Sequence, residues 1–368
     1  MSAARLPAPV PIGFDAHARR ELTGRVVRVA LLLMLTAALA AELWVGAVAI
    51  NVGQALAIVA DALGFTSQAW GPWAYGPAER TVLLALRLPR ALGACLVGAA
   101  LGVSGAALQG LFRNPLASPQ LIGVSSGAAA GSALAIVIGA PLVLVPALGG
   151  AAISIAAFTG AVVTSFTVYK LASIDGRPSV THMLLAGIAV TAFSGALIGL
   201  LQYLADADQL RDLSLWMLGD VGRTGWDELP WLAVGVIPMV VMLARLGDGL
   251  DVSVLGDAAA HDLGIDVAQL RRRVLIATSL AVGVAVACSG PIAFIGLAVP
   301  HILRLVRGPM HRALIVDSAL LGAALLLGAD ALARIVIAPA ELPVGILTAF
   351  LGAPLFLSLL IRDLRTQR

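Results

Sequence analysis

Ten apolar stretches with almost no charge constrain this chain more than any other feature of its sequence. A helix needs about 20 apolar residues to cross the hydrocarbon core of a bilayer, and most of the stretches reach that length. The chain of 368 residues is 60% hydrophobic and only 12% charged, whereas soluble domains carry roughly 25% charged residues. A soluble surface cannot be built from this composition, so we predict an integral membrane protein.

These stretches predict an all-α fold of ten transmembrane helices. We place the spans at residues 26–49, 88–110, 119–139, 146–171, 183–203, 230–246, 274–290, 292–305, 313–333 and 344–361. The eighth is short and closely follows Gly290-Pro291, so we expect a partial or broken helix there. Such a helix is tolerated only where protein or water covers its unpaired backbone groups.

Arginine and lysine side chains predict the orientation of these spans. An even number of spans puts both termini on one side, and that side holds 18 of the 24 basic residues, against 6 on the other. By the positive-inside rule both termini are then cytoplasmic. This gives a cytoplasmic tail over 1–24, a transmembrane domain over 25–362 and a second cytoplasmic tail over 363–368. The net charge of +3 reflects these loop anchors, and we expect no nucleic-acid partner.

A polar segment, residues 247–273, interrupts the later spans and falls on the cytoplasmic side. It contains Asp257, three alanines and Gly264, and it ends in three arginines. Alanine favours helix, an N-terminal acid complements the helix dipole, and glycine ends helices. We therefore expect a short helix with a small-residue face. From these residues alone, a docking handle and an ordinary amphipathic connector on the membrane are equal alternatives.

Motifs for chemistry are missing from the sequence. It has no G-x-x-x-x-G-K-[ST] phosphate loop, so we expect no ATP hydrolysis and no enzyme. The five histidines are scattered and the two cysteines lie in apolar runs, so we expect neither a metal site nor a cofactor in this chain. Few acids fall near the spans. Glu42 and Asp330 are two of them, and Asp330 is spaced to pair with Arg334 one helical turn away.

Small residues recur at helical spacing in three GxxxG pairs: Gly98 with Gly102, Gly127 with Gly131, and Gly195 with Gly199. Glycines at this spacing let two helix backbones approach closely. We expect such contacts within a compact bundle or across a dimer.

Several longer motifs follow one another in a fixed order: R-L-P-R at 87–90, V-G-A-A-L-G-V-S-G at 97–105, Gln109, N-P-L-A at 114–117, Pro119, G-V-S-S-G-A at 123–128, G-P-I-A-F-I-G-L-A-V-P-H at 290–301, E-L-P-V-G at 341–345 and L-G-A-P-L-F at 351–356. They resemble the FecCD family of permeases, which import iron-siderophores, haem or cobalamin. The resemblance covers residues from about 80 to 362, and residues 1–24 and 50–79 carry no part of it.

This resemblance implies a type II ABC importer permease that forms a homodimer in the bacterial inner membrane. Two cytoplasmic ATPase subunits, which hold ATP and Mg²⁺, would grip the polar segment, and a periplasmic binding protein would deliver the cargo. The contacts to the ATPase would come from Asp257, Ala260, Leu263 and Gly264. Asp257 stands where many relatives have Glu, which keeps the charge and shortens the reach.

Further residues are implied at the two ends of the bundle. Arg87, Arg90 and Arg334, the last of which follows the ninth span, would receive glutamates of the binding protein. The alternative is that these arginines snorkel to the membrane interface. A cytoplasmic gate is implied in two loops: Asn114 and Leu116 lie in the loop between spans two and three, and Val180 and Thr181 in the loop between spans four and five.

The cargo is expected to be haem first, a ferric siderophore second and cobalamin third. His182 and His301 are candidates for transient contact with haem iron, but His301 belongs to a motif found with any cargo. Two other classes stay open. An ion-coupled secondary transporter would need no ATPase, although acids are scarce in the spans. A membrane sensor or scaffold would transport nothing.

Overall fold

The computed structural model describes residues 14–46, 48–65, 71–138, 151–174 and 177–366. The described chain is all-α, with one pair of two-residue strands. Its helices are α1 (Phe14–Trp44), α2 (Val52–Ala62), α3 (Pro77–Thr81), α4 (Leu88–Leu111), α5 (Val124–Val137), α6 (Ala152–Leu171), α7 (Val180–Leu204), α8 (Ala207–Met217), α9 (Leu229–Arg245), α10 (Gly247–Ser253), α11 (Asp257–Asp262), α12 (Val267–Ser289), α13 (Ile295–Arg307), α14 (His311–Val336) and α15 (Val344–Thr366).

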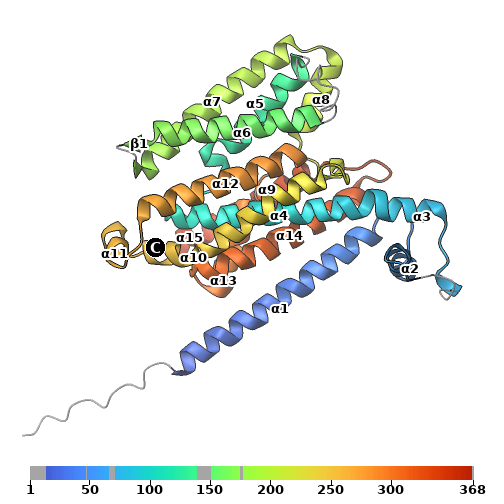
Figure 1. The fold of residues 1–368 in the computed structure, drawn as a ribbon, viewed down its shortest axis with the longest axis horizontal. Helices are drawn as coiled ribbons and strands as arrows, with labels where there is room; N and C mark the ends of the chain where they lie inside the picture. Colours follow the sequence, from blue (N-terminus) through green and yellow to red (C-terminus); the bar gives the residue numbers. More distant parts are fainter. Residues whose placement is uncertain (1–13, 47, 66–70, 139–150, 175–176, 367–368) are drawn as a thin grey trace, which may run out of the picture.

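The ten predicted spans correspond to α1, α4, α5, α6, α7, α9, α12, α13, α14 and α15. Among the described residues, six helical stretches are long and apolar enough to cross a bilayer on their own, and the bent pair of α9 and α10 makes a seventh. α5 and the part of α15 from Val344 to Ser358 are shorter apolar stretches, and α13 has only 13 residues. Protein on several sides can still carry such helices through a membrane. Most of the long helices run in roughly the same direction, and α1 lies at one edge of the bundle (Figure 1).

α4 occupies the centre of the bundle and packs against α9, α12, α13 and α14. Glycines make its contact with α14 close. A Cβ added to Gly98 would collide with the backbone of Gly322, and one added to Gly102 would collide with that of Ser318. Gly127 and Gly131 play the same part between α5 and α6. Two of the three GxxxG pairs are therefore used inside the chain.

A π-helical turn, η3 (Val82–Arg87), leads into α4 and continues the helix that begins at Pro77. Pro89 explains the turn, because proline has no N–H and its ring clashes with the carbonyl four residues earlier. In π register the carbonyl of Leu84 would face residue 89, which cannot donate. The indole N–H of Trp226 donates to that carbonyl at 2.8 Å. The R-L-P-R motif therefore lies where the π-helical turn ends and the α-helix begins.

The eighth span is short, as the sequence predicts. α12 ends at Ser289, Gly290 has φ +68° and Phe294 has φ +66°, and α13 begins only at Ile295. Gly290 lies against the carbonyl of Trp216, so a side chain would fit here neither in conformation nor in space. The broken backbone is covered by protein, which is the condition for such a break at membrane depth.

Several predicted boundaries are wrong. The predicted span 119–139 starts too early, because a 3-10 turn, η4 (Pro119–Ile122), and the left-handed Gly123 separate Pro119 from α5. Helix α12 starts at Val267, where Asp266 caps it, so the three arginines of the polar segment belong to α12. The limits of the two cytoplasmic tails stay a prediction, although α1 already begins at Phe14 and α15 continues to Thr366. Residues 1–13 and 367–368 lie outside the described chain.

Two segments between the predicted spans contain helices of their own. Residues 50–87 hold α2, a 3-10 turn η2 (Gly71–Trp73), α3 and η3, and residues 204–229 hold α8 and a 3-10 turn η6 (Val221–Arg223). α2 is seen nearly end-on at the right of Figure 1, so it runs across the direction of the long helices. The loop after α6 forms the small hairpin, β1 (Ser173–Ile174) with β2 (Arg177–Pro178).

Candidate functional site

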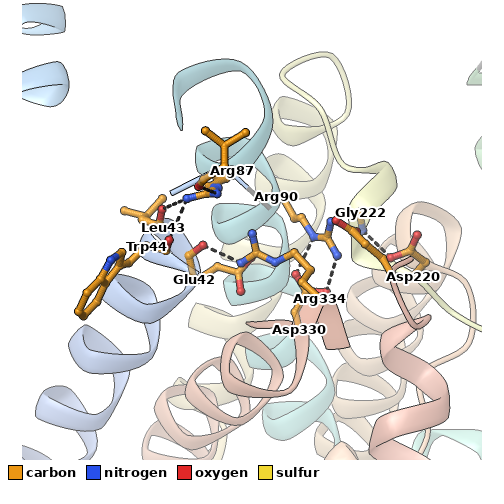
Figure 2. Close-up of polar contacts among 11 residues, drawn as sticks. Glu42, Leu43, Trp44, Arg87, Arg90, Asp220, Gly222, Asp330 and Arg334 are labelled. Carbon is orange, nitrogen blue, oxygen red and sulfur yellow. Dashed lines mark hydrogen bonds and ion pairs between the residues drawn. The ribbon is translucent and has the colours of Figure 1, made fainter. Parts of the chain in front are cut away.

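Six charged side chains meet at the end of the bundle where α1 stops and α14 finishes, and we call them the arginine cluster: Glu42, Arg87, Arg90, Asp330, Arg334 and Glu341. Figure 2 shows the first five of them. They come from α1, η3, α4, α14 and the turn before α15. The cluster joins segments that lie far apart in the sequence, so its geometry is a tertiary property of the fold.

Arg90 makes the most complete pairing in the arginine cluster. Its Nε lies 2.7 Å from Asp330 Oδ2 and its Nη2 lies 3.0 Å from Oδ1, while its Nη1 reaches Glu341 at 2.6 Å. The Asp330 side chain is fully buried and that of Arg90 is 11% exposed, whereas the Glu341 side chain is 53% exposed. Bidentate guanidinium–carboxylate pairs are the stronger and more directional ion pairs. One side of Arg90 is thus held inside, and the other meets the surface.

Arg334 and Glu42 form the most deeply buried ion pair of the arginine cluster. The guanidinium lies 2.6 Å from a Glu42 carboxylate oxygen and donates to the Glu42 backbone carbonyl, also at 2.6 Å. The two side chains are 4% and 0% exposed. Arg334 lies within α14, not after the span. It does not pair with Asp330 one turn away, as the spacing suggested, because the two residues bind partners on different helices.

Arg87 closes the end of α1. Its Nη1 donates to the carbonyls of Leu43 at 2.8 Å and Trp44 at 3.0 Å, and its Nη2 donates to the carbonyl of Val48. Carbonyls in the last turn of a helix have no partner within the helix and carry the negative end of its dipole. A buried guanidinium with several donors satisfies them and ties α1 to the start of α4.

These positions differ from the outward-aimed arginines that the sequence led us to expect. With backbone and side chain counted together, Arg87 is 4% exposed and Arg334 is 6% exposed, and their donors point to partners within the chain. Simple snorkelling does not describe them either, since a snorkelling head group lies in water. Docking of a binding protein at these arginines stays a prediction, and it requires some internal partners to be exchanged.

The polar segment lies at the opposite end of the bundle, where α10, α11 and the C-terminal end of α15 are drawn (Figure 1). The predicted short helix is confirmed as α11, Asp257–Asp262. Gly256 with φ +108° precedes it and Gly264 with φ +84° follows it, conformations that glycine adopts without strain. Ala260 is fully buried, while Leu263 is 62% exposed and nothing lies within 4 Å of a Cβ built on Gly264.

Asp257 holds the polar segment to its neighbours. Its carboxylate accepts from Arg113 at 2.8 Å and from Arg271 at 2.7 Å, and Arg113 also donates to the carbonyl of Ser253. Arg113 has φ +49°, an uncommon conformation for a residue with a side chain. The loop between α4 and η4 is therefore fixed to the polar segment.

A hollow of about 630 Å³ opens beside Asp257 and is lined by His261, Gly264, Ile265, Asp266, Val267, Ala268 and Arg271. Val254 and Leu255, just before α11, are 54% and 67% exposed. The sequence analysis missed these two residues, although an apolar pair inside a polar segment is a visible signal. Exposed apolar side chains on a polar segment are typical of a surface that binds another protein.

The predicted gate residues occupy two places. The side chain of Asn114 accepts from the backbone N–H of Leu116 at 2.9 Å, and Leu116 is 44% exposed. Val180 and Thr181 form the first turn of α7, which follows the small hairpin. The structure does not test a gate, so that role stays a prediction. Within the described ranges, no three His, Cys, Asp or Glu residues gather as metal ligands.

Known proteins resemble the chain along most of its length. A family model described as the FecCD transport family matches residues 31–362. The Yersinia pestis protein named "Hemin transport system permease protein HmuU" is 46% identical over 287 residues, which cover 78% of this chain and 85% of that protein. The Klebsiella pneumoniae "Vitamin B12 import system permease protein BtuC" is 40% identical over 278 residues, 76% of this chain and 82% of that one.

A solved structure has the same fold. It is described as "An inward-facing conformation of a putative metal-chelate type ABC transporter", and it matches with a TM-score of 0.78 and 30% identity over 92% of this chain and 99% of that chain. The family match also corrects one limit drawn from the sequence. It begins at residue 31, so residues 50–79 fall inside the family region rather than outside it.

Proposed function

Because the chain belongs to the FecCD transport family, we propose that it is the permease subunit of an ATP-driven importer for an iron complex, with haem as its cargo. The observation that carries the transport class is the family match over residues 31–362. The cargo rests on the 46% identity to the hemin permease, against 40% and 41% for vitamin B12 permeases. A ferric siderophore is the second candidate, and cobalamin is the third.

The ATPase partner is proposed from the polar segment. Leu255 and Leu263 expose apolar side chains just before and just after α11, where a lone subunit gains nothing from exposing them. Asp257, Ala260, Leu263 and Gly264 would form the contact, with Asp257 holding the segment and Leu263 entering the partner. ATP and Mg²⁺ would be bound by the ATPase, and this chain would contribute no covalent chemistry.

A second copy of the chain is the proposed partner in the membrane. The third GxxxG pair, Gly195 and Gly199, has open space around it, unlike the other two pairs. It lies on α7, whose exposed side chains include Leu185, Ile188 and Phe193. Small residues next to large apolar ones suit close helix packing between two copies. Light scattering in detergent tests this proposal, and a strictly monomeric wild-type chain would contradict it.

Sidedness follows from the basic residues and is also a proposal. The polar segment and both termini would be cytoplasmic, and the arginine cluster would lie at the periplasmic end. There Arg90 is the best placed arginine to receive a glutamate, because its partner Glu341 is half exposed. An incoming carboxylate could replace Glu341 without breaking the buried pair with Asp330. Loss of binding-protein affinity in Glu341→Arg, with wild-type folding, is the expected result, and unchanged affinity would count against it.

The proposed mechanism is alternating access. ATP binding draws the two ATPase subunits together, and the polar segments carry that displacement into the spans, which move between two packings. The pathway would lie between the α7 faces of two copies. A lining with few charges lets a bulky ligand pass without being held tightly.

The decisive experiment is uptake into proteoliposomes that contain the chain with its cognate ATPase and binding protein. Hemin, a ferric hydroxamate siderophore and cyanocobalamin are offered in turn, with ATP inside. We expect ATP-dependent accumulation of hemin, and none when the ATPase carries a substitution in its phosphate loop. Accumulation driven by an ion gradient without ATP would instead indicate a secondary transporter, and accumulation of another cargo would overturn the haem assignment alone.

A further inference from the structure

A partly buried joint connects the polar segment to α14. The carboxylate of Asp251, in α10, accepts from the backbone N–H groups of His311 at 2.6 Å and Arg312 at 3.2 Å. His311 Nδ1 lies 2.9 Å from the same carboxylate. The Asp251 side chain is 30% exposed and that of His311 is 8% exposed. The carboxylate thus caps the N-terminus of α14 from another helix.

Two glycines keep the joint tight. Gly247 in α10 lies against the backbone of Arg312, and Gly110 in α4 lies against the ring of His311. A side chain at either position would require its neighbour to move. Because charge-assisted bonds to the positive end of a helix are strong and directional, α10 cannot shift along or across α14 without breaking them. A displacement of α10 therefore moves the start of α14.

α14 makes close contacts near its start, at its middle and near its end, so a displacement of its start is transmitted along the helix. Near its start, Asp317 pairs with Arg28 of α1 at 3.2 Å and with Arg307 of α13. Near its end, Asp330 and Arg334 enter the arginine cluster. Between these points its backbone lies directly on that of α4 at Gly322. Close-packed interiors transmit displacement because they have no free space to absorb it.

The other ion pairs of the polar segment are more exposed to solvent. Asp257 and Arg113 are 49% and 42% exposed, and Asp248 and Arg312 are 67% and 75% exposed with a separation of 3.5 Å. Exposed ion pairs contribute little and exchange readily with water. Among the polar links from α10 and α11 that the described chain contains, the Asp251–His311 link is the best shielded.

We propose that Asp251 and His311 are positioning residues that pass the motion of the polar segment into α14, and through α14 to the arginine cluster at the far end. This inference rests on the proposed function, since it assumes that an ATPase moves the polar segment. It adds a defined route by which that motion reaches the end of the bundle where the cargo enters.

The test compares Asp251→Ala with Asp248→Asn, a control change in the same helix at an exposed pair. Each variant is reconstituted with the ATPase and the binding protein, and hemin uptake is divided by ATP hydrolysed. We expect Asp251→Ala to lower this ratio by about tenfold, within the usual range of coupling between sites. The ATPase should still co-purify with it. Asp248→Asn should keep the wild-type ratio, and an unchanged ratio in Asp251→Ala would overturn the proposal.

A second readout does not depend on the cargo. Spin labels at Leu332 in α14 and Leu204 in α7, both exposed, report the distance between these helices with and without ATP and vanadate. We expect the distance to change in the wild type and in Asp248→Asn, and to stay constant in Asp251→Ala. A change of wild-type size in Asp251→Ala contradicts the joint.

If Asp251→Ala does not fold, Asp251→Asn and His311→Gln replace it, since both keep the volume and part of the hydrogen bonding. They should give a smaller loss of the same ratio, and a wild-type ratio in both would overturn the joint. The two proposals fail differently. A wild-type chain without ATP-driven uptake of any cargo refutes the proposed function, whereas a coupled wild type with equally coupled variants refutes only the joint.

Discussion

The arginine cluster and the polar segment use the same chemistry at opposite ends of the bundle. Both hold arginines on carboxylates at 2.6–2.8 Å. In the arginine cluster the Glu42 and Arg334 side chains are at most 4% exposed, whereas in the polar segment Asp257 is 49% exposed. The Glu42–Arg334 pair is sealed between α1 and α14, whereas Asp257 lies on a short helix with open space beside it.

The difference shows what ion pairs do in each setting. A buried pair is costly to break because the remaining charge has no water, so it fixes which helices lie together. An exposed pair adds little stability and leaves its segment free to meet a partner. Buried ion pairs thus fix the packing of the helices at one end of the molecule. At the other end, exposed pairs keep the polar segment folded and leave its surface free to bind a partner.

The largest effect is expected from leaving a buried charge alone. Arg334→Met removes the partner of Glu42, whose side chain is fully buried. Unfolding free energy in detergent should fall by about 3–5 kcal/mol, the usual range for such a loss. Denaturant-induced unfolding of the purified chain measures it.

The control for Arg334→Met removes both charges. Glu42→Gln with Arg334→Met should recover most of the lost stability, because no unpaired charge remains. If Arg334→Met is as stable as the wild type, the sealed description of the arginine cluster is wrong, and Arg334 is instead free for an external carboxylate.

A change at the exposed end should affect assembly and not folding. Leu263→Arg places a charge on a side chain that is 62% exposed. We expect no measurable loss of chain stability and a weakening of ATPase binding by about 2 kcal/mol, typical of a central interface residue. Titration of the ATPase against the chain in nanodiscs measures the affinity. Leu204→Arg, exposed on α7, is the matched control, and equal ATPase affinities for the two variants would count against the handle.

The smallest effect is expected at Asp257. Asp257→Asn weakens two exposed pairs, so unfolding free energy should change by less than about 1 kcal/mol. Salt should sharpen the contrast between the two ends, because 1 M NaCl screens exposed pairs and leaves buried ones nearly unchanged. Thermal unfolding of the wild type, Asp257→Asn and Arg334→Met at low and high salt tests this. A salt effect as large at the arginine cluster as at Asp257 would contradict it.

The spans and α11 could be predicted from the sequence because local properties decide them. Apolar length defines a span, and Asp257, the alanines and Gly264 define the short helix within a few residues. The partners of the arginines could not be predicted in this way. Arg90 and Asp330 are 240 residues apart, and Arg334 and Glu42 are 292 apart. Their pairing depends on how α1, α4 and α14 are rotated against one another, and spacing on a single helix suggested a different pair.

The exposed apolar pair Val254 and Leu255 was missed for a different reason. In a membrane protein an apolar side chain does not by itself indicate a protein-binding surface, because it can face lipid. Only its position on a segment outside the bundle gives it meaning, and that position is known once the polar segment has been located.

The open glycines of α7 have a consequence for inheritance. If the transport pathway forms between two copies, each copy lines one side of it. A defect in one copy then abolishes transport by the whole dimer. A cell that expresses an intact and a defective gene together would then assemble mostly mixed or defective pairs. Variants that still pair through Gly195 and Gly199 but cannot transport should therefore be dominant, whereas variants that cannot pair should be recessive.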